Sequence, residues 1–374
     1  MEKLHTADPQ WIGPYELTGR LGAGGMGVVY LGRSPGGRAV AVKVVKEHFA
    51  ADAEYRARFR REVGAARSVT GTFTAPVLDA DPDPEAGTGA PWLVTAYLPG
   101  LSLREAVAAF GALPPAALRM LAGGLAEALA DIHRAGIAHR DLKPGNIMLT
   151  TGGPRVIDFG IARPQDATVI TRVTSIIGTP GFMAPEQLSG GAAGPAGDIF
   201  SLGAVLLYAA SGREPFGAAD TATTRRDSGI EQANLGGIRD SGLHAFVTAC
   251  LRQEPDQRPT ATDLLDLLHA SRPSHPSDAA DVTETTAPVR EAAPSSAGWL
   301  PAALAEAIDR SAEEARDLPG LPARAAPEGH RITIPPVGAP LAAAETVVPT
   351  EDGQQQDREP QDGQPHDGPQ DGEP

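Results

Sequence analysis

Short apolar runs separated by turns dominate the first hundred residues. The runs Val28–Tyr30 and Ala39–Val42 are rich in β-branched residues, which favours strands. Between them, Ser34–Gly37 reads Ser-Pro-Gly-Gly, a sequence typical of a hairpin turn. The stretch from Tyr15 to about Tyr97 is therefore predicted to be mostly sheet.

Helical spacing appears once within this part, at about 53–67, and then governs residues 102–270. In the first helix Tyr55, Phe59 and Val63 recur every four residues, as on one face of a helix. The same spacing predicts helices at Ala116–Arg134, Ile199–Ala210 and Ala261–Ala270. A small sheet-rich lobe followed by a larger helical lobe is an α+β arrangement. The sequence thus predicts one two-lobed domain over 13–270, with lobes at about 13–98 and 99–270.

The last hundred residues have a different composition. Residues 271–374 are dominated by Ser, Pro, Ala, Thr, Asp and Glu, and they hold 7 Lys and Arg against 19 Asp and Glu. Such a segment buries too little apolar surface to offset chain entropy, so a disordered acidic tail is expected. Within it, Leu300, Leu304 and Ile308 share one helical face over Trp299–Leu318. This pattern fits a transient or partner-binding helix, and equally a chance spacing.

Charge and cysteine content exclude several classes of protein. The formal net charge of −15 leaves no basic excess for phosphates, which argues against a nucleic-acid-binding protein. The single cysteine, Cys250, cannot form an internal disulfide, which favours a reducing, cytoplasmic setting, and its apolar surroundings predict a buried hydrophobe. The N-terminus lacks the apolar core of a signal peptide, and the longest apolar run, about Ile199–Ala210, is too short to span a membrane.

A glycine loop, Gly22-Ala-Gly-Gly-Met-Gly27, is the first candidate for phosphate binding. Gly22, Gly24 and Gly27 would let backbone amides approach a ligand without obstruction by side chains. Dinucleotide-binding oxidoreductases use the same spacing, but between a strand and a helix. Here the loop lies between two strand-like runs, Tyr15–Leu21 and Val28–Gly32. A hairpin over phosphates is therefore predicted, and the oxidoreductase alternative is disfavoured.

Charged motifs follow in a fixed order. Lys43 ends an apolar run and needs an anionic partner, for which Glu62 is the candidate, although either residue alone would be read as a surface charge. Further motifs are His139-Arg-Asp-Leu-Lys-Pro-Gly-Asn146, Asp158-Phe-Gly160 and Gly178-Thr-Pro-Gly-Phe-Met-Ala-Pro-Glu186. In order and spacing, the set resembles the eukaryotic-like serine/threonine protein kinases of bacteria, particularly actinobacterial ones, over about Gly13–Ala270.

The resemblance implies transfer of the γ-phosphoryl group of Mg-ATP (or Mn-ATP) to protein Ser or Thr hydroxyls. Lys43, fixed by Glu62, would hold the α- and β-phosphates. Asp141 would orient the attacking hydroxyl and accept its proton, and Lys143, a Ser/Thr-kinase signature, would stand beside the γ-phosphate. Metal ligands of the type that Mg²⁺ prefers would be Asn146 and Asp158.

The resemblance also implies an ATP pocket. Thr95 falls at the gatekeeper position, and the backbone of Ala96 and Leu98 would face the adenine edge. The apolar residues expected to sandwich the ring are Leu21, Val29, Ala41 and Met148. Without the alignment, each of these apolar residues would be read as ordinary core.

Regulation by phosphorylation is expected from Arg140, a cation that in similar kinases binds a phosphorylated activation segment. Within residues 158–186, Thr171 and Thr174 are the favoured sites, whereas Thr179 is expected to be structural. Autophosphorylation in trans would require a transient homodimer.

Three further residues are expected to be structural. Glu186 and Arg258 would form an ion pair that pins the activation segment, and Asp198 would hold the backbone of the catalytic loop. In contrast, residues 213–240 hold few apolar positions where similar kinases dock substrates, so substrate docking departs from the family pattern.

Two questions stay open at this level. The alternative to an active kinase is a pseudokinase or scaffold acting through its tail. Pseudokinases usually lack at least one catalytic residue. The alternative is disfavoured because this chain has all of them: Lys43, Asp141, Asn146 and Asp158. The tail itself is either a passive spacer or, through threonines such as Thr346 and Thr350, a ligand for a phosphothreonine-reading partner.

Overall fold

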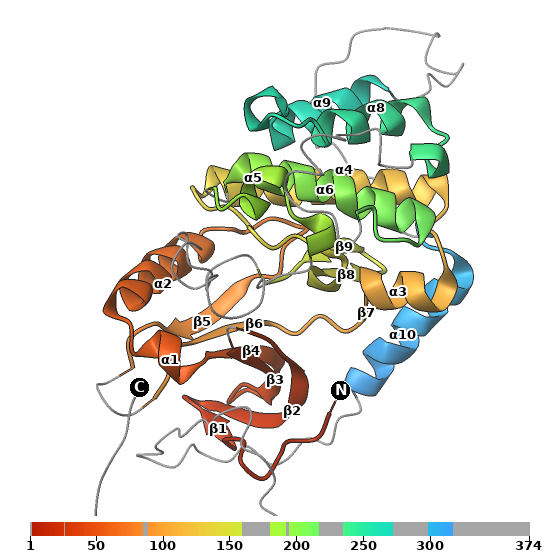
Figure 1. Ribbon diagram of the computed structural model, residues 1–374. Coiled ribbons are helices and arrows are strands. Elements are labelled where there is room, and N and C mark those ends of the chain that lie inside the picture. Colours follow the sequence, from red (N-terminus) through yellow and green to blue (C-terminus); the bar gives the residue numbers. More distant parts are fainter. Residues whose placement is uncertain are drawn as a thin grey trace, which may run out of the picture. The chain divides into compact units, whose positions relative to one another are not determined.

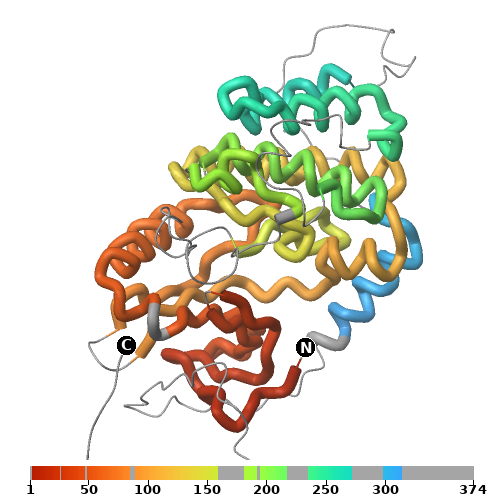
Figure 2. Tube along the Cα trace, viewed as in Figure 1, coloured from red at the N-terminus to blue at the C-terminus, as the bar shows by residue number. Residues whose placement is uncertain are grey.

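The chain forms a strand-rich part followed by a helix-rich part (Figures 1 and 2). The structure, a computed structural model, describes residues 2–25, 27–84, 89–158, 180–191, 194–216, 235–271 and 298–316. All of these lie in the first of the two units into which the chain divides, residues 1–335. The α+β arrangement predicted from the sequence is confirmed.

Six antiparallel strands form the first sheet in the order β1-β2-β3-β4-β6-β5. They are β1 Trp11–Ile12, β2 Tyr15–Ala23, β3 Gly27–Arg33, β4 Ala39–Val45, β5 Val77–Asp81 and β6 Trp92–Ala96. Burial alternates along β4, where Val40, Val42 and Val44 enter the core. Since neighbouring side chains of a strand point to opposite faces, Ala41 and Lys43 are left on the other face, where they line a cavity.

The glycine loop is a hairpin tip, as predicted. It joins β2 to β3, whose pairing continues up to Ala23 opposite Val28. A Cβ atom added to Gly27 would lie 2.2 Å from the carbonyl oxygen of Val44, so only glycine fits there. The loop therefore lies between two strands, which excludes a dinucleotide-binding unit at this position.

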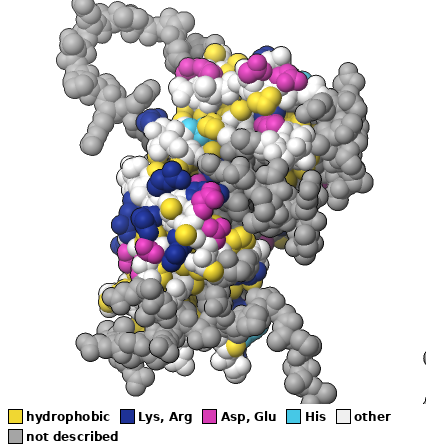
Figure 3. Space-filling model, turned by 60° about the vertical axis from the view of Figure 1, so that its left-hand side comes forward, with side chains coloured by type: hydrophobic (Ala, Val, Ile, Leu, Met, Phe, Trp, Pro, Cys, Tyr) yellow, Lys and Arg dark blue, Asp and Glu magenta, His cyan; other side chains and the backbone are white. Residues whose placement is uncertain are grey.

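Helix α2, Ala53–Ala66, follows the short helix α1, Glu47–Ala50, and lies beside the sheet (Figure 1). The Asp52 side chain caps it by accepting hydrogen bonds from two backbone amides of its first turn. Tyr55, Phe59 and Val63 face the core, as their spacing predicted. Its outer face carries several arginines, of which Arg60 pairs with Asp83 at 2.5 Å. Figure 3 shows Lys and Arg side chains gathered on one side of the molecule and interspersed with acidic ones.

The second part is built around helices α4 and α6, which pack against each other. Its helices are α3 Leu103–Phe110, α4 Pro115–Arg134, α5 Pro185–Leu188, α6 Pro195–Ser211, α8 Ser241–Cys250 and α9 Ala261–Ala270. A three-stranded sheet, β7 Leu101–Ser102, β8 Ile147–Thr150 and β9 Gly153–Val156, joins it to the first part. Short 3₁₀ helices lie at Pro144–Asn146, Pro180–Phe182, Leu235–Gly237 and Pro255–Gln257.

Helix α6 is the predicted buried core helix, with all of its residues from Gly197 to Ala209 buried. Gly203 allows close packing, because an added Cβ would lie 2.8 Å from the Cβ of Cys250. Cys250 is fully buried, and burial raises the pKa of its thiol, as expected for a structural hydrophobe. Among the described residues, no helix combines the length and the apolar character needed to cross a membrane.

Helix α10, Ala302–Arg316, contradicts part of the tail prediction. Leu300, Leu304 and Ile308 are buried and belong to the main hydrophobic core. The expectation of a disordered tail is therefore wrong for residues 298–316, because the domain offers an apolar surface that offsets the chain entropy of this helix. The remainder of 272–374 lies outside the described residues.

Candidate active site

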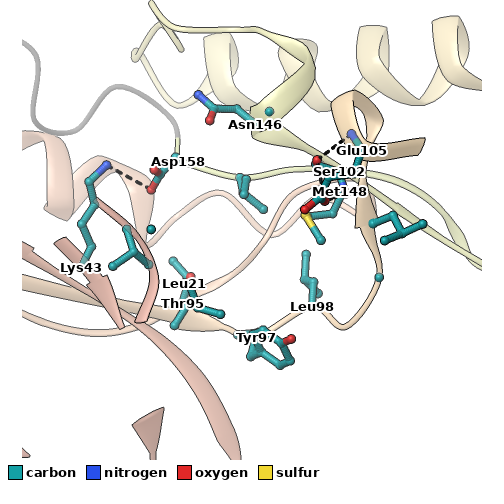
Figure 4. Close-up of a pocket in the computed structure, with 18 of the residues that line it drawn as sticks. Leu21, Lys43, Thr95, Tyr97, Leu98, Ser102, Glu105, Asn146, Met148 and Asp158 are labelled. Carbon is teal, nitrogen blue, oxygen red and sulfur yellow. Dashed lines mark hydrogen bonds and ion pairs between the residues drawn. The ribbon is translucent and has the colours of Figure 1, made fainter. Parts of the chain in front are cut away.

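A cavity of about 550 Å³ lies between the first sheet and the helical part. It contains most of the predicted nucleotide-binding residues, namely Leu21, Gly22, Val29, Ala41, Lys43, Thr95, Ala96, Leu98 and Met148. Two of the predicted residues, Gly24 and Gly27, are not part of its lining. Figure 4 shows that strand β4, strand β6 and strand β8 each supply side chains to it, among them Lys43, Thr95 and Met148, and that the segments between the strands supply others.

Nine lining residues were not predicted from the sequence: Leu93, Tyr97, Gly100, Leu101, Ser102, Glu105, Gly145, Ile157 and Ser311. Two of these carry a recognisable local signal, because Ser102 and Glu105 form the capping box of α3. Ser311 lies in α10, more than 150 residues after Asp158 in the sequence, and only the apolar spacing of its helix pointed to that segment.

The polar end of the cavity is formed by Lys43 and Asp158. The Nζ atom of Lys43 lies 3.1 Å from Oδ1 of Asp158, and both side chains remain partly exposed (Figure 4). Asp158 has a backbone φ of 59°, a left-handed conformation that Asp tolerates better than most residues. A lysine beside a carboxylate at the end of a cavity can bind a phosphate together with its metal ion.

The catalytic-loop residues are brought together beside this end. Lys143 Nζ lies 2.9 Å from Oδ2 of Asp141. Asn146 donates from Nδ2 to the carbonyl oxygen of Asp141, at 2.8 Å. Asp141 itself does not line the cavity, whereas Asn146 does. The loop therefore holds a carboxylate, a lysine and an amide within hydrogen-bonding reach of one another.

Glu62 does not pair with Lys43, and the predicted ion pair is wrong for this structure. Its Oε1 lies 2.5 Å from Nη1 of Arg140, with both side chains only about a tenth exposed. Burial raises the pKa of Glu62, and the Arg140 guanidinium opposes this shift. The other carboxylate oxygen of Glu62 is buried without a hydrogen-bond partner among the described residues. Arg140 thus takes the carboxylate, while Lys43 is neutralised by Asp158.

The backbone of the catalytic loop is held by Asp198, as expected. Its two oxygens accept hydrogen bonds from the backbone amides of His139 and Arg140, both at 2.7 Å. A third contact joins Oδ2 to Nε2 of His133 at 2.8 Å. These bonds support an unfavourable conformation, because Arg140 has a φ of 62°, which costs a bulky residue about 1–3 kcal/mol.

The expected ion pair between Glu186 and Arg258 is present and bidentate. The two N–O distances are 2.7 and 2.9 Å. Arg258 also donates to the backbone carbonyls of Ala196, Arg252 and Gln253. This guanidinium therefore ties the segment around Glu186 to helix α6 and to the loop before α9.

The residues fit a metal-bound nucleotide. The amide nitrogen of Asn146 is occupied by Asp141, which leaves the Oδ1 oxygen as the group available to a cation. Asp158 supplies a carboxylate from the same cavity, and such oxygens are the ligands that Mg²⁺ takes when substrate phosphates complete its shell. No group of three or more His, Cys, Asp or Glu in the described parts of the chain could hold a metal by itself.

Several predicted features lie outside the described residues. They are the phosphorylation sites Thr171 and Thr174, the remaining activation-segment residues 159–179, the segment 217–234, and the tail threonines.

This fold and this cavity define a nucleotide-binding domain of the protein kinase type. Residues 15–268 match the protein kinase domain family, to which the chain therefore belongs. A solved structure, that of Rad53 1–466 in complex with AMP-PNP, shares the fold with a TM-score of 0.55 and 21% identity, covering 68% of this chain and 64% of that one.

Two curated relatives are much more similar in sequence. The probable serine/threonine-protein kinase PkwA of Thermomonospora curvata is 52% identical over 265 residues, which is 71% of this chain and 35% of that protein. The serine/threonine-protein kinase AfsK of Streptomyces coelicolor is 47% identical over 265 residues, covering 71% and 32%. The chain thus spans about a third of the length of these relatives. The similarity to actinobacterial Ser/Thr kinases agrees with the resemblance that the sequence motifs indicated.

Proposed function

We propose that this chain is a serine/threonine protein kinase that transfers the γ-phosphoryl group of ATP to hydroxyl groups of proteins. When bound, the metal–nucleotide complex supplies the phosphoryl group and a cation that neutralises it. Lys43 binds phosphate oxygens at the polar end of the cavity, and Asn146 and Asp158 hold the metal. Asp141 orients the protein hydroxyl and accepts its proton, while Lys143 balances the charge beside it.

One observation carries this proposal. Lys43 and Asp158 are 3.1 Å apart in the cavity that also contains Asn146 and the apolar residues expected around adenine. The Asp141–Lys143 pair adjoins Asn146. A pseudokinase would not need this complete set, and the names of the relatives describe kinases.

Incubation with radiolabelled ATP, Mg²⁺ or Mn²⁺ and a generic protein substrate tests the proposal. Wild-type protein should label Ser and Thr, as read by phosphoamino-acid analysis, and Asp141→Asn should reduce the rate by at least about 100-fold because the base is lost. Asp83→Asn, an exposed acidic control far from the site in the sequence, should behave as wild type. Absence of labelling by wild type with either metal would refute the proposal.

We further propose that the Glu62–Arg140 pair belongs to the state before activation. A phosphate on Thr171 or Thr174 would compete with Glu62 for Arg140, because a doubly charged group forms stronger charge-assisted bonds with guanidinium than a carboxylate does. Glu62, whose second oxygen is buried without a hydrogen bond, would then become available to Lys43. Phosphorylation between two copies of the chain supplies such a phosphate.

Mass spectrometry after incubation with ATP tests this second proposal. Phosphate should appear on Thr171 or Thr174 of the wild type, and on tagged Asp141→Asn protein only when wild type is added. Thr171→Ala/Thr174→Ala should remain slow after incubation, whereas Thr168→Ala serves as the matched control. A fully active enzyme without phosphate in this segment would show that the proposal is wrong. A phosphothreonine-reading partner of the tail stays a prediction from sequence.

A further inference from the structure

Helix α10 lies beyond the part of the chain that matches the protein kinase domain, yet it is packed against that domain. The match ends at residue 268, and α10 begins at Ala302. Leu304 and Ile308 are 0% and 2% exposed, and they share one hydrophobic core with the helices of the domain. Burial of this apolar face stabilises the docked position of the helix.

The docking surface is the segment where the two parts of the domain are joined. Helix α10 contacts β7 and β8 and runs beside them (Figure 1). Just before the helix, Trp299 donates from Nε1 to the carbonyl oxygen of Thr150 at 3.1 Å. Gly100, directly before β7, has no room for a side chain, since an added Cβ would lie 2.5 Å from the Leu149 carbonyl oxygen. The same position lies 4.0 Å from the Ile308 side chain, within ordinary van der Waals contact of α10.

One turn after Ile308, Ser311 reaches the cavity itself. Its Oγ lies 3.5 Å from the carbonyl oxygen of Gly100, which is long for an O–H···O hydrogen bond. The hydroxyl therefore keeps hydrogen-bonding capacity for a ligand. Gly100, which Ser311 contacts, lies two residues before Ser102. Ser102 and Glu105 also line the cavity and lie opposite Lys43 and Asp158 (Figure 4). A nucleotide whose phosphates reach Lys43 would thus place its uncharged nucleoside part toward Ser102, Glu105 and Ser311.

We infer that α10 is part of the nucleotide site. The docked helix supplies Ser311 as a hydrogen-bonding group for the nucleoside part of ATP, and it holds residues 98–102 in the conformation that shapes the cavity. This inference rests on the proposed function, because it takes ATP as the ligand. It assigns to a helix outside the matched kinase domain a direct role in nucleotide affinity.

Three full-length variants test the inference. Leu304→Asp places a charge in the buried face, and Ala303→Asp places the same residue on the exposed face one position away. Ser311→Ala removes only the hydroxyl. Hydrogen–deuterium exchange of residues 98–102 and 300–311 measures docking without any ligand, and calorimetry with Mg-ATP measures affinity.

Leu304→Asp should speed exchange in both segments by at least about tenfold, because a local opening replaces the docked state. The Kd for Mg-ATP should then rise at least about fivefold, whereas Ala303→Asp should change neither quantity. Ser311→Ala should keep exchange protection and raise the Kd about two- to fivefold, the effect of one hydrogen bond.

Faster exchange with an unchanged Kd in Leu304→Asp would overturn the inference while leaving the proposed function intact. Unchanged exchange in that variant would likewise overturn it, since α10 would not be docked through Leu304. Should Leu304→Asp not fold, an unchanged Kd in Ser311→Ala would overturn the role of the hydroxyl. A wild-type protein that binds no Mg-ATP would instead refute the proposed function itself.

Discussion

Replacing Asp198 by Asn tests how strongly the catalytic loop depends on one buried carboxylate. Asp198 is 1% exposed and accepts two backbone hydrogen bonds at 2.7 Å and one from His133 at 2.8 Å. Asn has nearly the same shape, but one of its oxygens is replaced by an NH₂ group. In either orientation that group faces a backbone N–H of His139 or Arg140, so two donors oppose each other.

The expected magnitude follows from these contacts. Losing one charge-assisted hydrogen bond and leaving one buried N–H unsatisfied costs about 1.5–3 and about 1–3 kcal/mol respectively. The remaining bonds weaken because the acceptor is no longer charged, while the cost of burying a charge disappears. We therefore expect Asp198→Asn to lower the free energy of unfolding by about 2–4 kcal/mol.

Urea unfolding followed by circular dichroism measures this loss, with comparison at equal m-values. The control is Asp83→Asn, whose side chain is about half exposed in its pair with Arg60 and which should change stability by at most about 1 kcal/mol. The phosphorylation rate of Asp198→Asn should fall at least about tenfold, because the loop bearing Asp141 is displaced. Nucleotide affinity should change little, since Asp198 does not line the cavity. Equal stabilities of Asp198→Asn and wild type would refute the reasoning.

Two further substitutions test how the burial of a charged or titratable side chain affects the free energy of unfolding. Arg258→Ala should lower the free energy of unfolding by about 3–5 kcal/mol, because it leaves Glu186 and three backbone carbonyls without their donor. Arg60→Ala, which breaks an exposed ion pair, should lower it by only about 0.2–1 kcal/mol. Equal losses in urea unfolding would contradict this expectation. His139 is fully buried, and burial lowers its pKa. Below about pH 6.5 the unfolded state therefore binds more protons than the folded state. The free energy of unfolding should fall as the pH falls below that value, by up to about 1.4 kcal/mol per pH unit. Between pH 7.5 and 5.5, the free energy of unfolding should depend less steeply on pH in His139→Gln than in the wild type. An identical pH dependence would exclude His139 as the cause.

Much of this protein follows from local sequence alone. Alternation of Val40, Val42 and Val44 with smaller or polar residues fixes both the strand and the face on which Lys43 lies, because side chains alternate on any strand. The four-residue spacing of Tyr55, Phe59 and Val63 likewise predicts helix α2 and its buried face. Nine of the eleven residues predicted to bind the nucleotide line the cavity, but these were placed by the resemblance to a known family and not by a local pattern.

Only the tertiary structure decided which cation forms an ion pair with Glu62. The sequence analysis paired Glu62 with Lys43, but the fold brings Arg140 to 2.5 Å from it. Helix α10 illustrates the same limit: its apolar spacing was visible, but spacing cannot tell whether a complementary surface exists. Periodicity is a property of neighbouring residues, whereas burial and pairing depend on groups that are distant in the chain, and only packing sets their distances.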